Sequence, residues 1–352
     1  MSTAALDDAI AFAIAHETRW SRDIGPGWGI HHHDPAPWNV LRGPVHARGG
    51  VSGVILVDGR EVAAWGEPDR ADLTFSVAKT YLALLAGIAH DRGLIPDVQE
   101  PIGRRVPGIG FDAGHNAGIT WEHMLQQTSE WEGSCFGLPD VAERYRTVQF
   151  QEVTAPGTKG DARPLRAPGS FWEYNDVRVN QLSLALLHLF RRPLPEVFRE
   201  AIMEPVGASD GWRWTAYDDA WTIIDGVRMP SVPGGSHWGG GVSISSRDQA
   251  RIGRMLVDGG VAGGRRVLSD EWIRRMTTPC AIAPFYGYLT WLNTGRRVFP
   301  GVPETGFFAF GAGSSFTWMQ PEHRLVVVVR WIDADHADGF FSRVLEGIGD
   351  RQ

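Results

Sequence analysis

The sequence predicts an α+β protein in which a central antiparallel sheet, flanked by helices, is assembled from both ends of the chain. Strand-like patterns occur within residues 53–65 and 314–331, and they enclose a long stretch with little strand-like alternation. Residues 97–236 instead hold short helical patterns separated by loops rich in glycine and proline. We therefore expect an α/β domain formed by residues 1–96 and 237–352, a mainly α-helical domain at 97–236, and an active site between the two.

The N-terminal elements follow in order from their apolar spacing. Residues 6–16 repeat apolar side chains at helical spacing and predict the first helix. Two short apolar runs, 53–57 and 61–65, flank the turn pair Asp58–Gly59 and predict a β-hairpin. Residues 76–92 predict a helix that is apolar on nearly every side, which is typical of a buried helix.

The remaining elements are shorter or lie near the C-terminus. The stretch from Ser246 to Gln249 has the form of a capping box, which opens a helix. The C-terminal hairpin turns at residues 321–323. Further helices are expected at 120–127, 176–192, 246–257 and 337–349, and further strands at 242–244, 314–320 and 324–331.

Composition excludes several classes of function. With 352 residues, 43% hydrophobic and 21% charged, the chain can bury a large core. A net charge of −7 gives no basic surface for nucleic acid or an anionic membrane. The longest apolar run, 81–89, is too short to cross a bilayer, and the N-terminus lacks the pattern of a signal peptide. Because Cys135 and Cys280 form no disulfide framework, we expect a cytoplasmic protein.

Lysine is rare in this chain. Of 34 basic residues only Lys79 and Lys159 are lysines, and every other one is arginine. A buried lysine can lose its proton, whereas an arginine cannot. A lysine in an apolar helix is also costly unless it has a purpose. Lys79 is therefore a candidate for acid–base chemistry.

Ser76 and Lys79 together predict an activated nucleophile. Ser76 falls where a strand turns into the buried helix, so free N–H groups at the helix start would favour negative charge on its oxygen. Lys79 follows one turn later on the same face. Burial would lower the pKa of the amine and let it take the hydroxyl proton. The alternative is a chance pairing of the two residue types.

The stretch from Phe75 to Thr80 resembles the first motif of the penicillin-recognising serine hydrolases. The likeness is greatest to the class C β-lactamase branch with its esterase and nylon-oligomer-hydrolase relatives, and residues 119–129 resemble the stretch after that motif. The similarity runs from about Gly53 to the C-terminus. It implies a β-lactamase/transpeptidase-like fold and a hydrolase that cleaves a small ester or amide through an acyl-enzyme. It implies no metal and no organic cofactor.

The resemblance assigns the second motif to Tyr174. A tyrosine beside a lysine can have a lowered pKa, share the serine proton as general base and later protonate the leaving group. The family usually has Asn or Ser two residues later, where this chain has Asp176. Either Asn175 substitutes in binding substrate, or Asp176 caps the next helix, which we favour. Without the resemblance, Tyr174 would be interpreted as a core aromatic.

The third motif corresponds to residues 309–313. Gly311 would allow close backbone approach, and the N–H of Ala312 would join that of Ser76 as an oxyanion hole, with Gly313 beside it in the cleft. The basic and hydroxyl residues that the family usually has here are missing. Those groups help to hold a β-lactam carboxylate, so their absence favours an esterase or amidase.

Further residues are weaker candidates for the substrate cleft. His237 and Trp238 precede three glycines and either line the cleft or serve structure. Several tryptophans near the motifs could wall an apolar pocket, although most of the 15 tryptophans are expected in the core; they are Trp131, Trp172, Trp238 and Trp318. The cluster His31–His33 with Asp34 contains metal-ligand types, but adjacent loop residues seldom converge on one ion.

Alternative functions remain open at this point. An acyltransferase or a weak β-lactamase could use the same residues, since another acceptor can replace water. A catalytically silent protein that binds a ligand in the cleft would keep the shape without the chemistry. A metal hydrolase built on the histidine cluster would lose activity on chelation.

Overall fold

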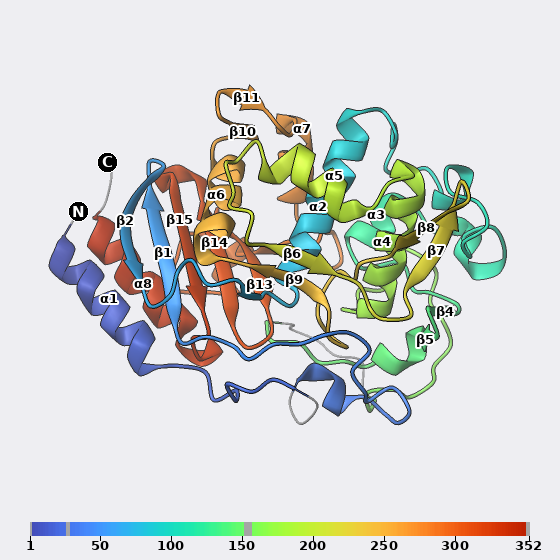
Figure 1. Cartoon of the computed structure of the whole chain (residues 1–352), viewed down its shortest axis with the longest axis horizontal. Helices are drawn as coiled ribbons and strands as arrows, with labels where there is room; N and C mark the ends of the chain where they lie inside the picture. The colour runs from blue at the N-terminus through green and yellow to red at the C-terminus, as the bar shows by residue number, and fades with distance from the viewer. Residues whose placement is uncertain (1, 26–28, 151–156, 350–352) are drawn as a thin grey trace.

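The computed structural model describes residues 2–25, 29–150 and 157–349, with a six-stranded antiparallel sheet beside a helix-rich part (Figure 1). The strand order is β12-β13-β14-β15-β1-β2, so neighbours come from opposite ends of the chain. The strands of this sheet are β1 (Ser52–Val57), β2 (Arg60–Trp65), β12 (Trp291–Leu292), β13 (Phe307–Gly311), β14 (Ser315–Gln320) and β15 (Leu325–Arg330).

Strand β1 joins the two ends of the chain. It pairs with β15 in a register that sets Gly53 opposite Val329, and it pairs with β2 on its other edge. A register shift interrupts the β1–β2 pairing between Ile55 and Leu56. The predicted sheet of N- and C-terminal strands is therefore confirmed, and both predicted hairpins form.

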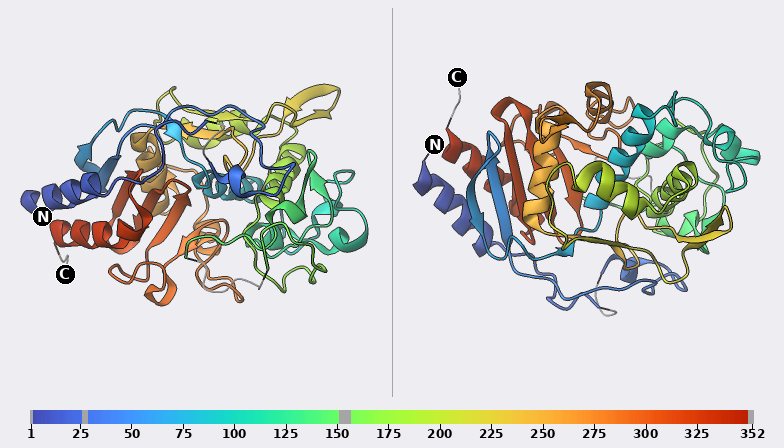
Figure 2. Two further views of the ribbon diagram at one scale, coloured as in Figure 1. Left: turned by 90° about the horizontal axis from the view of Figure 1, so that it is seen from below. Right: turned by 45° about the horizontal axis from the view of Figure 1, so that its top comes forward.

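Helices cover both faces of the sheet (Figure 2). On one face the Phe341 ring of α8 (Ala337–Ile348) lies 5.0 Å from the Trp318 ring of β14. On the other, Ala250 of α6 (Ser246–Val257) packs in one cluster with Val326 and Val328 of β15. A strand that is buried on both faces needs apolar side chains at every position. This explains the four consecutive valines in the sequence of β15.

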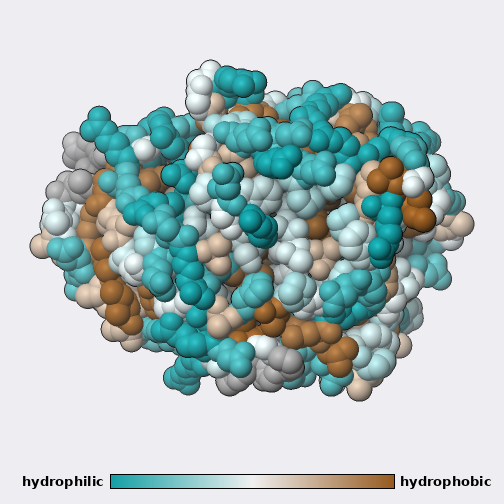
Figure 3. All heavy atoms as spheres, viewed as in Figure 1, coloured by the Kyte–Doolittle hydropathy of each residue, from teal (hydrophilic) through white to brown (hydrophobic). Residues whose placement is uncertain are grey.

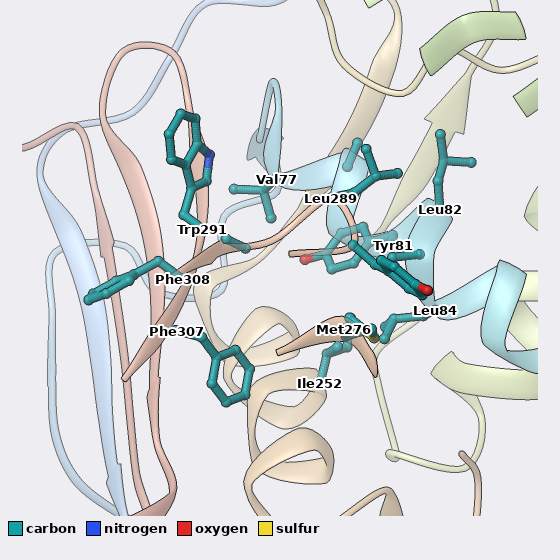
Figure 4. Packing of buried hydrophobic residues seen from close by; sticks show 14 of the residues in the cluster. Val77, Tyr81, Leu82, Leu84, Ile252, Met276, Leu289, Trp291, Phe307 and Phe308 are labelled. Atoms are coloured by element: carbon teal, nitrogen blue, oxygen red, sulfur yellow. The ribbon is translucent and has the colours of Figure 1, made fainter. Parts of the chain in front are cut away.

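Helix α2 is the central element of the core. Every residue from Val77 to Ala89 is buried, and the helix packs against β13, β14, α4, α5 and α7. Figure 4 shows Tyr81 and Leu84 among apolar side chains that come from the other elements. The α-helices are α1 (Thr3–Ala15), α2 (Val77–Asp91), α3 (Trp121–Leu125), α4 (Asp176–Phe190), α5 (Leu194–Phe198), α6 (Ser246–Val257), α7 (Asp270–Met276) and α8 (Ala337–Ile348).

Two details differ from the expectation. Ser245 caps α6 by accepting a hydrogen bond from the Asp248 N–H, so the cap lies one residue before the predicted box at Ser246. The stretch 97–236 also contains strands of two to four residues, which are too short to show alternation in the sequence. The other short strands are β3 (Asp72–Leu73), β4 (Ser134–Cys135), β5 (Leu138–Pro139), β6 (Arg213–Thr215), β7 (Trp221–Ile224), β8 (Val227–Pro230), β9 (Gly241–Ile244), β10 (Val261–Ala262) and β11 (Arg265–Arg266).

The face shown in Figure 3 is mostly hydrophilic and carries small separate apolar patches. The exposed apolar side chains include Ile223 and Val227 of the β7–β8 hairpin. None of the helices in the described ranges combines the length and the apolar character needed to cross a membrane.

Candidate active site

Ser76 lies at the junction between β3 and α2. Strand β3 ends at Leu73, and Ser76 is the N-terminal cap residue of α2, as the sequence predicts. Phe75 between them has φ of 51°, a costly conformation for a bulky residue. Its ring packs edge-on against the rings of Trp20 and Trp331, at centroid distances of 5.5 and 6.3 Å. This aromatic packing holds the turn that presents the serine.

Lys79 lies within hydrogen-bonding distance of Ser76. Its Nζ is 2.8 Å from the Ser76 Oγ, and the Lys79 residue is 1% exposed. Burial lowers the pKa of Lys79 below its ordinary value, although the Asp176 carboxylate opposes this effect. The structure thus brings together the amine and the hydroxyl that the sequence pairs.

Tyr174 lies on the same side of the site, with the Lys79 Nζ 4.7 Å from the centre of its ring. Burial raises the pKa of Tyr174 and the Asp176 carboxylate raises it further, while a hydrogen bond with Ser76 lowers it in part. The expectation of a lowered pKa is therefore wrong, because desolvation of the phenolate outweighs the nearby cations. At neutral pH Tyr174 is a proton donor.

Asn175, and not Asp176, caps α4. The Asn175 Oδ1 accepts hydrogen bonds from the N–H groups of Val177 and Arg178, at 2.9 and 3.2 Å. Asn175 is wholly buried and its amide donates to Asp140, so the structure gives it no role in binding substrate. The favoured capping role of Asp176 is wrong, because Asn175 has the extended backbone that a cap residue needs.

The Asp176 carboxylate instead forms ion pairs inside the site. It contacts the Lys79 Nζ through one oxygen and Arg146 through the other. Burial raises the pKa of Asp176, but Lys79 and Arg146 outweigh this effect and hold it well below the ordinary value. Asp176 therefore remains an anion beside the amine.

Arg146 is a site residue that no sequence pattern indicated. Its Nη1 lies 2.6 Å from Glu143 Oε2, and its guanidinium carbon lies 5.2 Å from the centre of the Tyr174 ring. Since all but two of the 34 basic residues of the chain are arginines, composition could not single it out. Gly235 was missed as well. A Cβ there would lie 3.1 Å from both the Lys79 Nζ and the Asp176 Oδ1.

His237 is buried behind the site and does not line the pocket that contains Ser76. Its Nδ1 lies 3.1 Å from Asp176 Oδ2, and its Nε2 lies 2.9 Å from Asp34 Oδ2. Asp34, Glu143 and His237 place potential ligand atoms within 4.8 Å of one another. The Lys159 ammonium contacts Asp34 and lies 2.7 Å from Glu143 Oε1, so a lysine supplies the cation here. Asp34 thus groups with these residues, not with the predicted histidine cluster.

Strand β13 ends against the backbone of Ser76. A Cβ on Gly311 would lie 1.9 Å from the Thr74 carbonyl oxygen and 3.2 Å from the Ser76 nitrogen, so only glycine fits. Ala312 follows directly and lines the same pocket as Ser76. Gly313, with φ of 70°, packs against Trp331, where a Cβ would lie 2.4 Å from the ring. It serves the turn and is not among the residues that line the pocket.

The pocket at Ser76 has a volume of about 170 Å³. The apolar part of its wall comes from Ile30, Val148, Trp291 and Phe310.

None of the four tryptophans proposed for the wall is among the residues that line this pocket. Trp131 packs on Phe111 in the core, with ring centroids 4.8 Å apart. Trp238 is wholly buried and donates its indole N–H to the Trp38 carbonyl. The pocket tryptophan is Trp291, on a strand too short to recognise in the sequence.

Comparison with known proteins assigns the family. A sequence model of the beta-lactamase family matches residues 39–335, which include Ser76, Lys79, Tyr174 and Ala312. The chain belongs to the beta-lactamase family. The match covers most of the chain, so the predicted membership of this family is confirmed.

This beta-lactamase-family protein is 27% identical over 219 residues to the 6-aminohexanoate-dimer hydrolase of Paenarthrobacter ureafaciens. The aligned part is 58% of this chain and 50% of the relative, so the chain spans about half the length of the curated relative it matches.

Solved structures show the same fold at low identity. A family VIII carboxylesterase has a TM-score of 0.60 at 17% identity, covering 85% of this chain and 92% of that one. A D-stereospecific amidohydrolase from Streptomyces sp. has a TM-score of 0.58 at 17% identity, covering 96% and 98%. These values establish the beta-lactamase/transpeptidase-like fold of this beta-lactamase-family protein, and they identify no substrate.

Proposed function

We propose that this protein is a serine hydrolase that cleaves a small ester or amide through an acyl-enzyme on Ser76. The observation that carries the proposal is the distance of 2.8 Å between the Lys79 Nζ and the Ser76 Oγ, in a site where burial lowers the pKa of that amine. A neutral amine at this distance accepts the hydroxyl proton as the oxygen attacks.

The acylation step uses groups that face Ser76. The Ser76 Oγ attacks the carbonyl carbon while Lys79 takes the hydroxyl proton. The backbone N–H groups of Ser76 and Ala312 stabilise the oxyanion. Tyr174 gives its proton to the leaving oxygen or nitrogen and regains one from Lys79. Water then attacks the acyl-enzyme and releases the acid, with Lys79 as the base.

The pocket favours an uncharged, apolar acyl group. Trp291 and Phe310 form much of its wall. Arg146 also lines it, but two carboxylates already neutralise this guanidinium. Residues 309–313 provide no cation to hold the carboxylate of a β-lactam. These features support an esterase or amidase above a β-lactamase.

Intact-mass spectrometry tests the proposal. We would incubate the protein with p-nitrophenyl esters of increasing acyl length and with the matching anilides. A 6-aminohexanoate dimer, the compound that appears in the name of the relative, would be tested as well. We expect a transient adduct with the mass of the acyl group, located on the peptide that contains Ser76. Ser76→Ala should form no adduct and hydrolyse none of these compounds. Undiminished turnover by Ser76→Ala would refute the proposal.

A further inference from the structure

The carboxylate of Asp176 is one end of a buried row of charged side chains. His237 bridges Asp176 and Asp34, with nitrogen–oxygen distances of 3.1 and 2.9 Å. Lys159 contacts Asp34, and its Nζ lies 2.7 Å from Glu143 Oε1. Glu143 also lies 3.4 Å from His237 Nε2 and 2.6 Å from Arg146 Nη1, so the row leads back to the site. The side chains of His237, Asp34 and Glu143 are each at most 1% exposed. Charges buried to this degree are stable only when they are paired.

Both ring nitrogens of His237 face carboxylate oxygens. An ionised carboxylate only accepts hydrogen bonds, whereas a neutral imidazole has one donor and one acceptor nitrogen. A neutral His237 would therefore turn a lone pair toward either Asp34 or Asp176. The geometry makes His237 an imidazolium that donates to both carboxylates.

The charges around the site balance without Lys79. The buried carboxylates are Asp34, Glu143 and Asp176. The cations other than Lys79 are Arg146, Lys159 and His237. Burial raises the pKa of Glu143, but Arg146, His237 and Lys159 outweigh this effect and lower it to about 2, so it remains an anion. Three negative charges thus meet three positive ones, and a proton on Lys79 would leave an unbalanced positive charge.

The groups around Lys79 come from several elements. They are Asp176 on α4, Tyr174 before it, Arg146 and Glu143 in the segment 143–146, and Ser76 on α2 itself. Asp176 keeps two cationic partners, Arg146 and His237, when Lys79 is neutral. The neutral amine can then donate a hydrogen to Asp176 while its lone pair accepts the hydroxyl hydrogen of Ser76.

We propose that Lys159 and His237 are positioning residues that keep Lys79 in its neutral, proton-accepting form by neutralising the carboxylates behind it. The inference rests on the proposed function, since it concerns how Lys79 activates Ser76. It also gives the second lysine of the chain a purpose. Neither residue lines the pocket that contains Ser76. Each acts through the charge that it supplies to the buried row.

The test measures how fast a fluorophosphonate probe labels Ser76 between pH 5 and pH 10. In Lys159→Met the row gains one unbalanced negative charge, which favours the protonated form of Lys79. We expect the pH at which labelling becomes half-maximal to rise by roughly one unit, so that labelling below this pH slows about tenfold. His237→Gln should shift the profile in the same direction.

A double variant separates charge from packing. Lys159→Met with Asp34→Asn removes one cation and one anion, so it should return the profile to its wild-type position. Lys159→Arg keeps the charge and should also keep the profile, while Arg265→Met removes an exposed charge on β11 as a matched control. An unshifted profile in folded Lys159→Met and His237→Gln, judged by thermal melting, would overturn the inference. So would a double variant that stays shifted. Failure of the wild-type Ser76 to label at any pH would instead refute the proposed function.

Discussion

The Lys79 amine and the Asp176 carboxylate contact each other inside the protein, with side chains that are only 1% and 2% exposed. The pair fixes the amine beside Ser76, because Lys79 contacts the hydroxyl and the carboxylate at once. The partner of Lys79 is thus Asp176, which directly follows the α4 cap residue Asn175 and lies two positions after Tyr174. One short segment supplies both the phenol and the anion of the site.

Removing the charge of Asp176 should destabilise the fold. Asp176→Asn leaves Arg146 and His237 without the anion that they share, and breaking a buried pair in this way costs about 3–5 kcal/mol. Urea unfolding of the two proteins measures the difference. Asp69→Asn is the control, because it removes a surface pair with Arg247 and should cost about 1 kcal/mol or less. Equal losses in the two variants would contradict the central position of Asp176.

Replacing Lys79 by arginine should abolish most of the activity. Lys79→Arg keeps the positive charge but cannot lose its proton, so the rate should fall by about 10²- to 10⁴-fold at every pH. Steady-state hydrolysis of a p-nitrophenyl ester measures the effect, and thermal melting shows whether the variant is folded. A variant that retains more than about a tenth of the rate would show that Lys79 is not the base.

A methyl group at Gly311 should separate β13 from the nucleophile. A Cβ there would lie 1.9 Å from the Thr74 carbonyl oxygen, so the strand end must move away from Ser76. A displacement of about 1 Å in a catalytic group can cost 10²-fold in rate, and we expect Gly311→Ala to lose about that much. Gly118→Ala is the matched control, because nothing lies within 4 Å of its Cβ. Comparable kcat values for the two variants would exclude a role for this strand end.

Acid should unfold the protein partly through Glu143. Its pKa is about 2 in the folded protein, against an ordinary value of 4.5, so the ionised group stabilises the fold above about pH 4.5. This contribution, roughly 3 kcal/mol, is lost as the pH falls through 4.5 towards 2. Glu143→Gln should therefore lower stability at pH 7 and flatten its decline in acid, as followed by urea unfolding. Glu271→Gln removes an exposed carboxylate that pairs with Arg275, and it should change the slope far less, because solvent screens that pair.

Esters should be far better substrates than β-lactams. Residues 309–313 lack a cation, and Arg146 is held by Asp176 and Glu143, so no free positive charge among these groups meets a β-lactam carboxylate. We expect kcat/KM for a p-nitrophenyl ester to exceed that for a chromogenic cephalosporin by at least about 10²-fold. A cephalosporin turned over as fast as the ester would contradict this assignment.

Local patterns in the sequence predicted much of the fold and the centre of the site. Helical geometry alone was enough to predict that Ser76 and Lys79 lie on one face of an apolar helix. The family motif then located Tyr174 and the strand end at Gly311 and Ala312. These features are short, contiguous and chemically distinctive, so a single sequence suffices to find them.

The other site residues depend on contacts between distant segments. Arg146 and Lys159 lie in loops, and only the folded chain shows that they meet Asp176 and Asp34. The direction of the Tyr174 pKa shift also depends on burial, which overrides the nearby cations. Asn175 caps α4 because its backbone is extended at this position. The residue types alone do not determine that conformation.

The pairing of β1 with β15 has a consequence for biosynthesis. While the chain is still on the ribosome, the first hairpin has already emerged, but the strand that covers its apolar edge is translated much later. An uncovered strand edge is prone to aggregation, so stalled or truncated chains should need a chaperone. Ser76 likewise emerges long before Ala312. On the proposed function, the nascent chain therefore carries a serine that cannot act as a nucleophile until the segment with Ala312 has been translated and folded.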